Sequence, residues 1–188
     1  MRKLKKIKAN IKAYFFHPFI ACIVGTKCGK KENFISIAWF TQLSFQPCIA
    51  GISVSPKRFS YELLKESQGF SINFLDFSKT DIVEWIGTHS GREHNKIKKL
   101  KEMGMDIFYT EELNLPALSE SYLAAECKKI WEREFGDHVL FVGEVLNFYI
   151  KEDFFDENTL PTERIFPVVY AGKGRYLTVD WKKLEKKR

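Results

Sequence analysis

Three segments of this 188-residue chain combine small hydroxyls, cations and large rings in patterns that could bind an anion or a flat ring. The segment 53–60, SVSPKRFS, places hydroxyls, a proline turn and two cations ahead of an expected helix. Such groups, together with the free amides of a helix start, are the parts of a phosphate pocket. The segment 87–96, GTHSGREHNK, adds donors that could reach the same anion. The segment 36–45, SIAWFTQLSF, joins large rings to hydroxyls and to backbone groups at a strand end.

Each of these segments also has a purely structural explanation when it is considered alone. Segment 36–45 is typical of a packed core strand whose hydroxyls satisfy local backbone groups. Segment 53–60 is typical of a capped helix with surface charges, and segment 87–96 of a solvated connection between helices. Both kinds of explanation stay open at the level of single segments.

Residue patterns for other common chemistries are missing from the sequence. Ser90 lies in HSG and not in the G-x-S-x-G turn of a hydrolase, and there is neither a Rossmann G-x-G-x-x-G nor a Walker loop. The histidines and cysteines lack the spacing of metal ligands, so we expect no metal site. These residues are His17, His89, His94, His138, Cys22, Cys28, Cys48 and Cys127.

The net charge of +6 is concentrated at the two ends of the chain, MRKLKKIK and WKKLEKKR. We expect a basic N-terminal arm at 1–12, a domain at 13–180 and a basic C-terminal tail at 181–188. A basic barrel that binds nucleic acid is an alternative, but cations at the ends and not among the strand aromatics disfavour it. Without an apolar run of membrane-spanning length or a signal peptide, and with cysteines in apolar surroundings, we expect a cytoplasmic protein that binds no membrane.

The hydrophobic pattern predicts a mainly β fold with helices. Apolar, strand-like runs occur at the start of the chain, and a hairpin signal at Gly136-Asp137 joins two long strands within 122–153. In three segments the apolar residues are spaced as on one face of a helix. Strands and helices do not alternate regularly along the chain. A β-barrel with helices on its outside is the expected architecture. The predicted strands are 19–27, 33–44, 46–56, 70–76, two within 122–153, and a hairpin in 168–179; the predicted helices are 57–70, 78–88 and 93–104.

The order and content of these segments resemble the flavin reductase-like, FMN-binding split-barrel family, and within it the flavoredoxins. NFISIAWFTQLSFQP at 33–47 looks like the N-x-x-T/S-x-x-W-F-T-x-x-S-x-x-P strand of that family. ISVSPKRFSYELLKESQGFSINF looks like its serine-rich phosphate turn, helix and next strand, and GTHSGREHNKIKKLKEMG like its G-x-x-S-G-x-x-x-x-K-F segment. ECKKIWEREFGDHVLFVGEV and YAGKGRYLTV resemble its late hairpin and its closing segment. Gln42 departs from the pattern, because proline is frequent there.

This resemblance implies an FMN-binding split β-barrel that forms a homodimer with the flavin near the subunit interface. It also implies an oxidoreductase that passes electrons from NADH or NADPH through FMN to a small-molecule or protein acceptor. His138, in GDHVLF, is the candidate catalytic residue near the nicotinamide or the flavin, and a structural turn histidine is the alternative. A flavoredoxin-type FMN electron carrier without its own nicotinamide site is the alternative. The residues that the resemblance and the three segments assign to the cofactor are Asn33, Ser36, Ile37, Ala38, Trp39, Phe40, Thr41, Ser53, Ser55, Arg58, Ser60, Thr88, Ser90 and Lys96.

Alternation along 36–41 gives a sharper expectation for the ring. It places Ser36, Ala38 and Phe40 on one face of a continuous strand, with the intervening residues on the other face. Small side chains at Ser36 and Ala38 leave room for a flat ring, whereas Trp39 would flank the ring or support the dimer.

Overall fold

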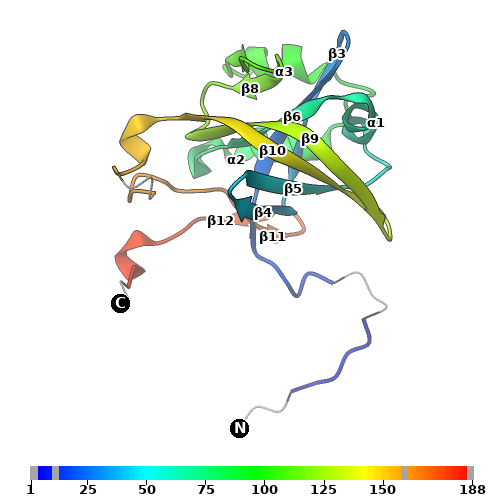
Figure 1. Ribbon diagram of the computed structural model, residues 1–188. Helices are drawn as coiled ribbons and strands as arrows, with labels where there is room; N and C mark the ends of the chain where they lie inside the picture. The colour runs from blue at the N-terminus through cyan, green and yellow to red at the C-terminus, as the bar shows by residue number, and fades with distance from the viewer. Residues whose placement is uncertain (1–3, 10–12, 158–160, 186–188) are drawn as a thin grey trace.

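The computed structural model describes residues 4–9, 13–157 and 161–185 (Figure 1). Its strands are β1 (Phe19–Ile20), β2 (Cys22–Cys28), β3 (Lys31–Ile37), β4 (Phe40–Phe45), β5 (Cys48–Val54), β6 (Gly69–Phe74), β7 (Ile107–Tyr109), β8 (Pro116–Leu118), β9 (Leu123–Phe135), β10 (His138–Ile150), β11 (Val169–Gly172) and β12 (Arg175–Leu177). Its α-helices are α1 (Phe59–Glu66), α2 (Thr80–Thr88) and α3 (Lys96–Glu102), and short 3₁₀ turns lie at Phe77–Lys79, Glu152–Phe154 and Trp181–Lys183.

A seven-stranded antiparallel sheet in the order β3-β2-β6-β9-β10-β5-β4 forms the body of the protein. Its two outermost strands, β3 and β4, are consecutive in the chain, and only Ala38 and Trp39 lie between them. Three peptide steps span at most about 11 Å, so the two edges of the sheet must approach each other. The sheet therefore curls into a barrel, and the predicted split β-barrel is confirmed.

This closure corrects one expectation from the sequence. The predicted single strand 33–44 is two strands, because the pairing ends at Ile37 and resumes at Phe40. Strand β3 pairs with β2, whereas β4 pairs with β5. Strict alternation across Ser36–Thr41 therefore does not describe this stretch, and its side chains reach different parts of the molecule.

Alternating residues of β2 supply two separate cores. Cys22 and Val24 belong to a cluster inside the barrel, together with Leu64 of α1 and Phe141 of β10. Ile23 points to the opposite face and packs in a second cluster against helices. There Ile82, Val83 and Ile86 form the buried stripe of α2, at the three- and four-residue spacing of one helical face. The second core holds α2 and α3 against the outside of the barrel.

The late part of the chain follows the sequence prediction closely. β9 and β10 form a long hairpin that extends well beyond the rest of the sheet (Figure 1) and turns at Gly136, which has a φ of 61°. β11 and β12 form the short closing hairpin, and β1 pairs with β11. The two-stranded β7–β8 sheet was not predicted. Trp181, in the segment predicted as a tail, donates its indole N–H to the carbonyl of Ile165 at 2.6 Å, so the start of that segment is attached to the body.

No helix in the described part of the chain is long and apolar enough to cross a bilayer.

Candidate functional site

A small cavity of about 170 Å³ lies where β3, the turn before α1 and the α2–α3 connection meet. The fold thus brings the predicted segments 53–60 and 87–96 together at one place. We call it the anion cavity, because its polar lining is dominated by cations, hydroxyls and one amide. Its lining includes Asn33, Lys57, Arg58, Phe59, Ser60, Gly87, His89, Ser90, Gly91, Arg92 and Lys96.

Arg58 occupies the position just before the first turn of α1, at the mouth of this cavity. Its side chain does not cap the helix. Within the described residues, no carboxylate lies within ion-pair distance of its guanidinium. An unpaired guanidinium next to the first amides of a helix favours anion binding, because the guanidinium and the amides can all donate hydrogen bonds to the same anion.

Lys96 lies at the base of the anion cavity and is 4% exposed. Its ammonium donates to the carbonyl oxygens of Phe34 at 2.9 Å and Ile86 at 2.6 Å. Burial, and secondarily the charge of Arg58, lowers the pKa of Lys96 to about 8. An ammonium has three N–H donors, so Lys96 retains one beyond those two carbonyls.

The loop after α2 is pressed against the barrel wall at Gly91. A Cβ atom on Gly91 would collide with the side-chain amide of Asn33 and with the ring of Phe59. Buried Asn33 in turn donates its Nδ2 hydrogen to Ser60 Oγ at 2.8 Å, which leaves the Ser60 hydroxyl proton for another acceptor. Glycine at this position therefore lets the loop approach closely enough to place Ser90 on the cavity.

A second cavity of about 240 Å³ adjoins the first and shares Arg58 and Gly87 with it. We call it the tyrosine cavity, because Tyr170 and Tyr176 of the closing hairpin form one side of it. Its other lining residues are Ala21, Ser36, Ile37, Ala38, Val83, Glu84, Thr88 and Gly174. The two cavities therefore meet at Arg58 and Gly87, with cations prominent in the anion cavity and two tyrosine rings in the other.

The serine and threonine hydroxyls in the tyrosine cavity are already engaged with the fold. Ser36 Oγ donates to the carbonyl of Val83 at 2.6 Å and so ties β3 to α2. Thr88 Oγ1 donates to the carbonyl of Glu84 at 2.8 Å within α2. These side chains therefore shape the wall, whereas Ile37 and Ala38 offer apolar surface to an occupant.

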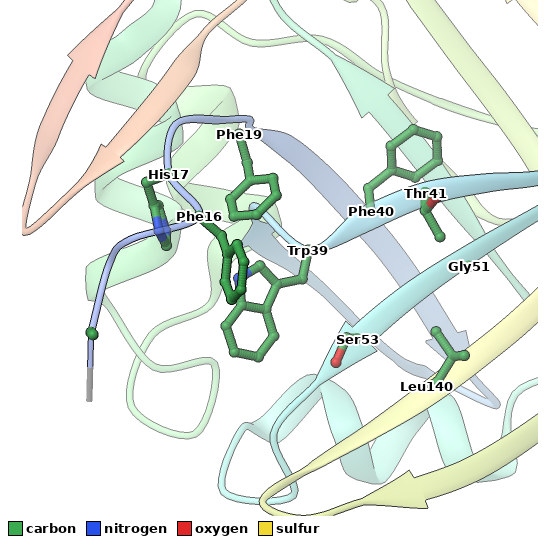
Figure 2. A pocket seen from close by; sticks show the side chains of 10 residues that line it. Phe16, His17, Phe19, Trp39, Phe40, Thr41, Gly51, Ser53 and Leu140 are labelled. Carbon is green, nitrogen blue, oxygen red and sulfur yellow. The ribbon is translucent and has the colours of Figure 1, made fainter. Parts of the chain in front are cut away.

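A third, larger cavity of about 320 Å³ is lined by Trp39 together with residues of the N-terminal segment, β4, β5 and β10 (Figure 2). We call it the apolar cavity. Phe16, His17 and Phe19 come to it from the N-terminal segment, and the Phe16 and Trp39 rings overlap in this view. It is completed by Ala13, Phe40, Thr41, Gly51, Ser53 and Leu140. Ala38 lines the tyrosine cavity and Trp39 lines the apolar cavity, so the two-residue connection between β3 and β4 borders both cavities.

Comparison with known proteins decides which family has this architecture. The model of the flavin reductase like domain matches residues 16–178. The chain belongs to this family. A solved FMN-binding protein from Thermus thermophilus, crystallised with bound 1-cyclohex-2-enone, is 32% identical over 99% of this chain and 100% of its own, with a TM-score of 0.86.

Two further similarities extend the comparison. Flavoredoxin from Methanosarcina acetivorans has the same fold, with 24% identity, a TM-score of 0.82, and coverage of 95% of this chain and 92% of its own. An uncharacterized protein of Aeropyrum pernix is 32% identical over 159 residues, 85% of this chain. The match spans 59% of that relative's length.

The structure distributes the residues predicted for the cofactor over the three cavities. Asn33, Arg58, Ser60, Ser90 and Lys96 line the anion cavity. Ser36, Ile37, Ala38 and Thr88, again with Arg58, line the tyrosine cavity. Trp39, Phe40, Thr41 and Ser53 line the apolar cavity.

Ser55 lines none of these three cavities, and its Oγ accepts a long hydrogen bond, 3.5 Å, from the Lys57 amide in the turn before α1. With Ser53 in the apolar cavity, the serines of SVSP are apart from the cationic end of the site. From this segment, Arg58 and Ser60 line the anion cavity together with Lys57 and Phe59.

His138 stands beside the apolar cavity and not on its lining. Its Nδ1 lies 2.7 Å from the Asp137 carboxylate, and its ring centroid lies 4.5 Å from that of Trp39. The residue thus contacts the cavity through Trp39.

Several lining residues were missed from the sequence. Tyr170, Gly174 and Tyr176 lie in the closing segment YAGKGRYLTV, whose resemblance to the family assigns no role to its tyrosines. Also missed were three residues at or just before the start of the first predicted strand, Phe16, His17 and Phe19. Nothing in the sequence around them indicates that they lie near Trp39. Within the described residues, no group of three or more His, Cys, Asp or Glu side chains could hold a metal ion.

Proposed function

We propose that the joined anion and tyrosine cavities bind FMN and that the protein is a flavin-dependent oxidoreductase using NADH or NADPH. Arg58 carries the proposal, because its unpaired guanidinium stands where the two cavities meet. The family membership and the FMN-binding protein from Thermus thermophilus support it.

The chemistry of the lining fits the parts of FMN. A phosphate would meet Arg58, the first amides of α1, and the hydroxyls of Ser60 and Ser90. Lys96 would add positive charge from below. The isoalloxazine would find apolar surface at Ala38 and the two tyrosines of the adjoining cavity.

When bound, the flavin supplies a centre that accepts a hydride and releases electrons to an acceptor. The chain contributes position and electrostatics. Arg58 would fix the phosphate end, and the β3–β4 connection would fix the ring edge with its backbone. Trp39 and Phe40 would present an apolar, water-poor surface beside the ring for a nicotinamide or a small acceptor.

The assembly that we propose is a homodimer. Leu43, Phe45, Leu146, Phe148 and Ile150 are large apolar side chains that are 37–83% exposed along β4 and the second half of β10. Exposed apolar surface of this kind marks interaction sites in soluble proteins. A second copy of the chain covering these strands would also come close to the apolar cavity, which β4, β5 and β10 border.

Two measurements test the proposal. The purified, FMN-loaded protein should show the visible absorption bands of bound flavin, and anaerobic mixing with NADH or NADPH should bleach them in a stopped-flow trace. Loss of FMN on gel filtration, together with no affinity in a titration, would contradict flavin binding. Tight FMN binding with negligible reduction by both nicotinamides would instead support the carrier function of the flavoredoxin type.

A further inference from the structure

Glu84 of α2 is the one acidic residue among the described residues that line the tyrosine cavity. It is an exposed residue on the third turn of the helix. In the described part of the chain, no Lys, Arg or His side chain lies within 4.0 Å of its carboxylate. The cavity to which we assign the isoalloxazine therefore has a carboxylate without an ion-pair partner in its wall.

Two relationships place this carboxylate beside the closing hairpin. A Cβ atom on Gly174 would lie 3.5 Å from Glu84 Oε1. The pKa of the Tyr176 hydroxyl is raised, first by burial and then by the negative charge of Glu84. Gly174 and Tyr176 both line the tyrosine cavity. The charge thus lies between α2 and the β11–β12 hairpin, at the wall of the space for the ring.

The helix that carries Glu84 does not compensate its charge. Residues three and four positions apart are neighbours on a helical surface. At those spacings from Glu84 the chain has Thr80, Asp81, Gly87 and Thr88, and none of them is a cation. Asp81 adds a second negative charge on the same helix.

Arg58 is the cation among the described residues that line the tyrosine cavity, and it lies where this cavity meets the anion cavity. Under the proposed function its guanidinium pairs with the phosphate of FMN. The negative charge of that phosphate compensates the charge of Arg58. The carboxylate of Glu84 then remains as the uncompensated charge in the ring-lined part of the site.

We propose that Glu84 sets the reduction potential of the bound flavin. Transfer of a hydride adds two electrons and one proton to the uncharged oxidised ring, so the reduced ring is an anion until it takes a second proton from water. A nearby carboxylate repels that negative charge and disfavours the reduced form. The inference rests on the proposed function, which places the ring in this cavity.

This charge directs the protein towards electron donation. A lower potential makes the reduced protein a stronger reductant, and it leaves less driving force for hydride transfer from NADH or NADPH. Glu84 therefore favours transfer to acceptors of low potential.

The experiment measures the two-electron reduction potential of the FMN-loaded protein by anaerobic titration against a reference dye. The test variant is Glu84→Gln, which removes the charge and keeps the size of the side chain. The matched control is Asp81→Asn, which makes the same charge change at an exposed position of the same helix, outside the three cavities described above. Circular dichroism and a titration with oxidised FMN check that each variant is folded and binds the flavin.

We expect Glu84→Gln to bind reduced FMN about fivefold more tightly, with less than about twofold change for oxidised FMN. A fivefold change in the ratio of the two affinities raises the potential by about 20 mV, since tenfold corresponds to about 30 mV for two electrons. Asp81→Asn should shift the potential by less than half as much. The difference between Glu84→Gln and wild type should shrink in about 1 M salt, because exposed charges are screened.

Two results for the potential would overturn the inference: no change in Glu84→Gln, or a shift of equal size in Asp81→Asn. An equal loss of affinity for oxidised and reduced FMN in Glu84→Gln would also overturn it, because the side chain would then only shape the cavity. Failure of the wild type to bind FMN in the first titration would contradict the proposed function itself, before any potential is measured.

Discussion

The rings of Trp39 and His138 lie in contact, with centroids 4.5 Å apart and planes inclined by 46°. Trp39 belongs to the two-residue connection that closes the barrel, and His138 begins the second strand of the long hairpin. This contact joins the hairpin turn to the wall of the apolar cavity. His138 can therefore affect the position of Trp39, and through it the shape of the apolar cavity, although His138 does not line that cavity.

Replacement of His138 tests whether it acts through Trp39. We expect His138→Ala to raise the KM for the hydride donor about fivefold, since an aromatic pair contributes about 0.5–1.5 kcal/mol. His138→Phe should restore the value, because it keeps a ring against Trp39. Flavin affinity should change little in either variant. Equal and severe loss of turnover in both variants would show that the imidazole itself takes part in the reaction, as the sequence hypothesis has it.

Arg58 should distinguish FMN from riboflavin. We expect Arg58→Ala to weaken FMN binding by about 1.5–3 kcal/mol, the range for a hydrogen bond to a charged group. Riboflavin lacks the phosphate, so its affinity should stay nearly constant. Fluorescence quenching titrations measure both constants, with Lys98→Ala on the outside of α3 as the control. Equal losses for the two flavins would exclude Arg58 as a phosphate ligand.

Ala38 should set the space for the flavin ring. The side chain lines the tyrosine cavity, so Ala38→Leu would fill part of the space that we assign to the isoalloxazine. We expect FMN binding to be lost while the apoprotein keeps its circular dichroism spectrum, because one overpacked position costs about 1–3 kcal/mol of stability. Unchanged FMN affinity in a folded variant would place the ring elsewhere.

Lys96 should give FMN binding a pH dependence. Burial and the neighbouring charge of Arg58 lower the pKa of Lys96 to about 8, so its positive charge is lost as the pH rises through that value. FMN affinity should therefore fall between about pH 7 and pH 9.5, by about tenfold at most, since Lys96 has one spare donor. Riboflavin affinity should vary less. The Lys96→Met variant should lack this difference between the flavins, and its persistence there would assign the effect to another group.

The same ammonium affects stability in the opposite direction. The pKa of Lys96 is lower in the folded apoprotein than the ordinary value of 10.5, so between about pH 8 and 10.5 the unfolded chain binds more protons at this group. The contribution of Lys96 to the free energy of unfolding therefore increases as the pH rises through this window. Urea denaturation of the wild type and of Lys96→Met measures this contribution as the difference between their pH profiles.

The proposed dimer can be tested at its exposed apolar strand. We expect light scattering of the FMN-loaded protein to give the mass of two chains. Leu43→Asp/Phe45→Asp places two charges on β4, where the native side chains are 50% and 83% exposed, so it should shift the mass towards one chain without unfolding the barrel. FMN should dissociate more readily from the separated subunits. A monomeric mass for the wild type would contradict the proposal.

Much of the fold could be predicted from the sequence because its signals are local. The long hairpin is marked by a Gly-Asp turn between two apolar runs, and α1, α2 and α3 each show a helical period. The meeting of segments 53–60 and 87–96 at Arg58 and Lys96 was also expected. In both cases the information lies in residue type and order along the chain.

The parts that could not be predicted depend on contacts between distant segments. Alternation continues smoothly from β3 to β4, so nothing local reveals that the chain changes partners at Ala38 and Trp39. Tyr170 and Tyr176 reach the tyrosine cavity from more than a hundred positions after Ala38 and Arg58, through the pairing of β11 with β1. Ser53 and Ser55 have the composition of a phosphate turn, but their places in the fold direct them elsewhere.

The two-residue link between β3 and β4 also limits how this protein can change over evolutionary time. A loop at the rim of a barrel can gain or lose residues at little cost, because its length does not set the distance between paired strands. Ala38 and Trp39 differ, since together they fix the circumference of the barrel and separate two cavities. An insertion there would widen the gap between β3 and β4, and it would also separate the walls of the tyrosine cavity and the apolar cavity. Change at this link is thus confined to replacing side chains, with the number of residues held constant.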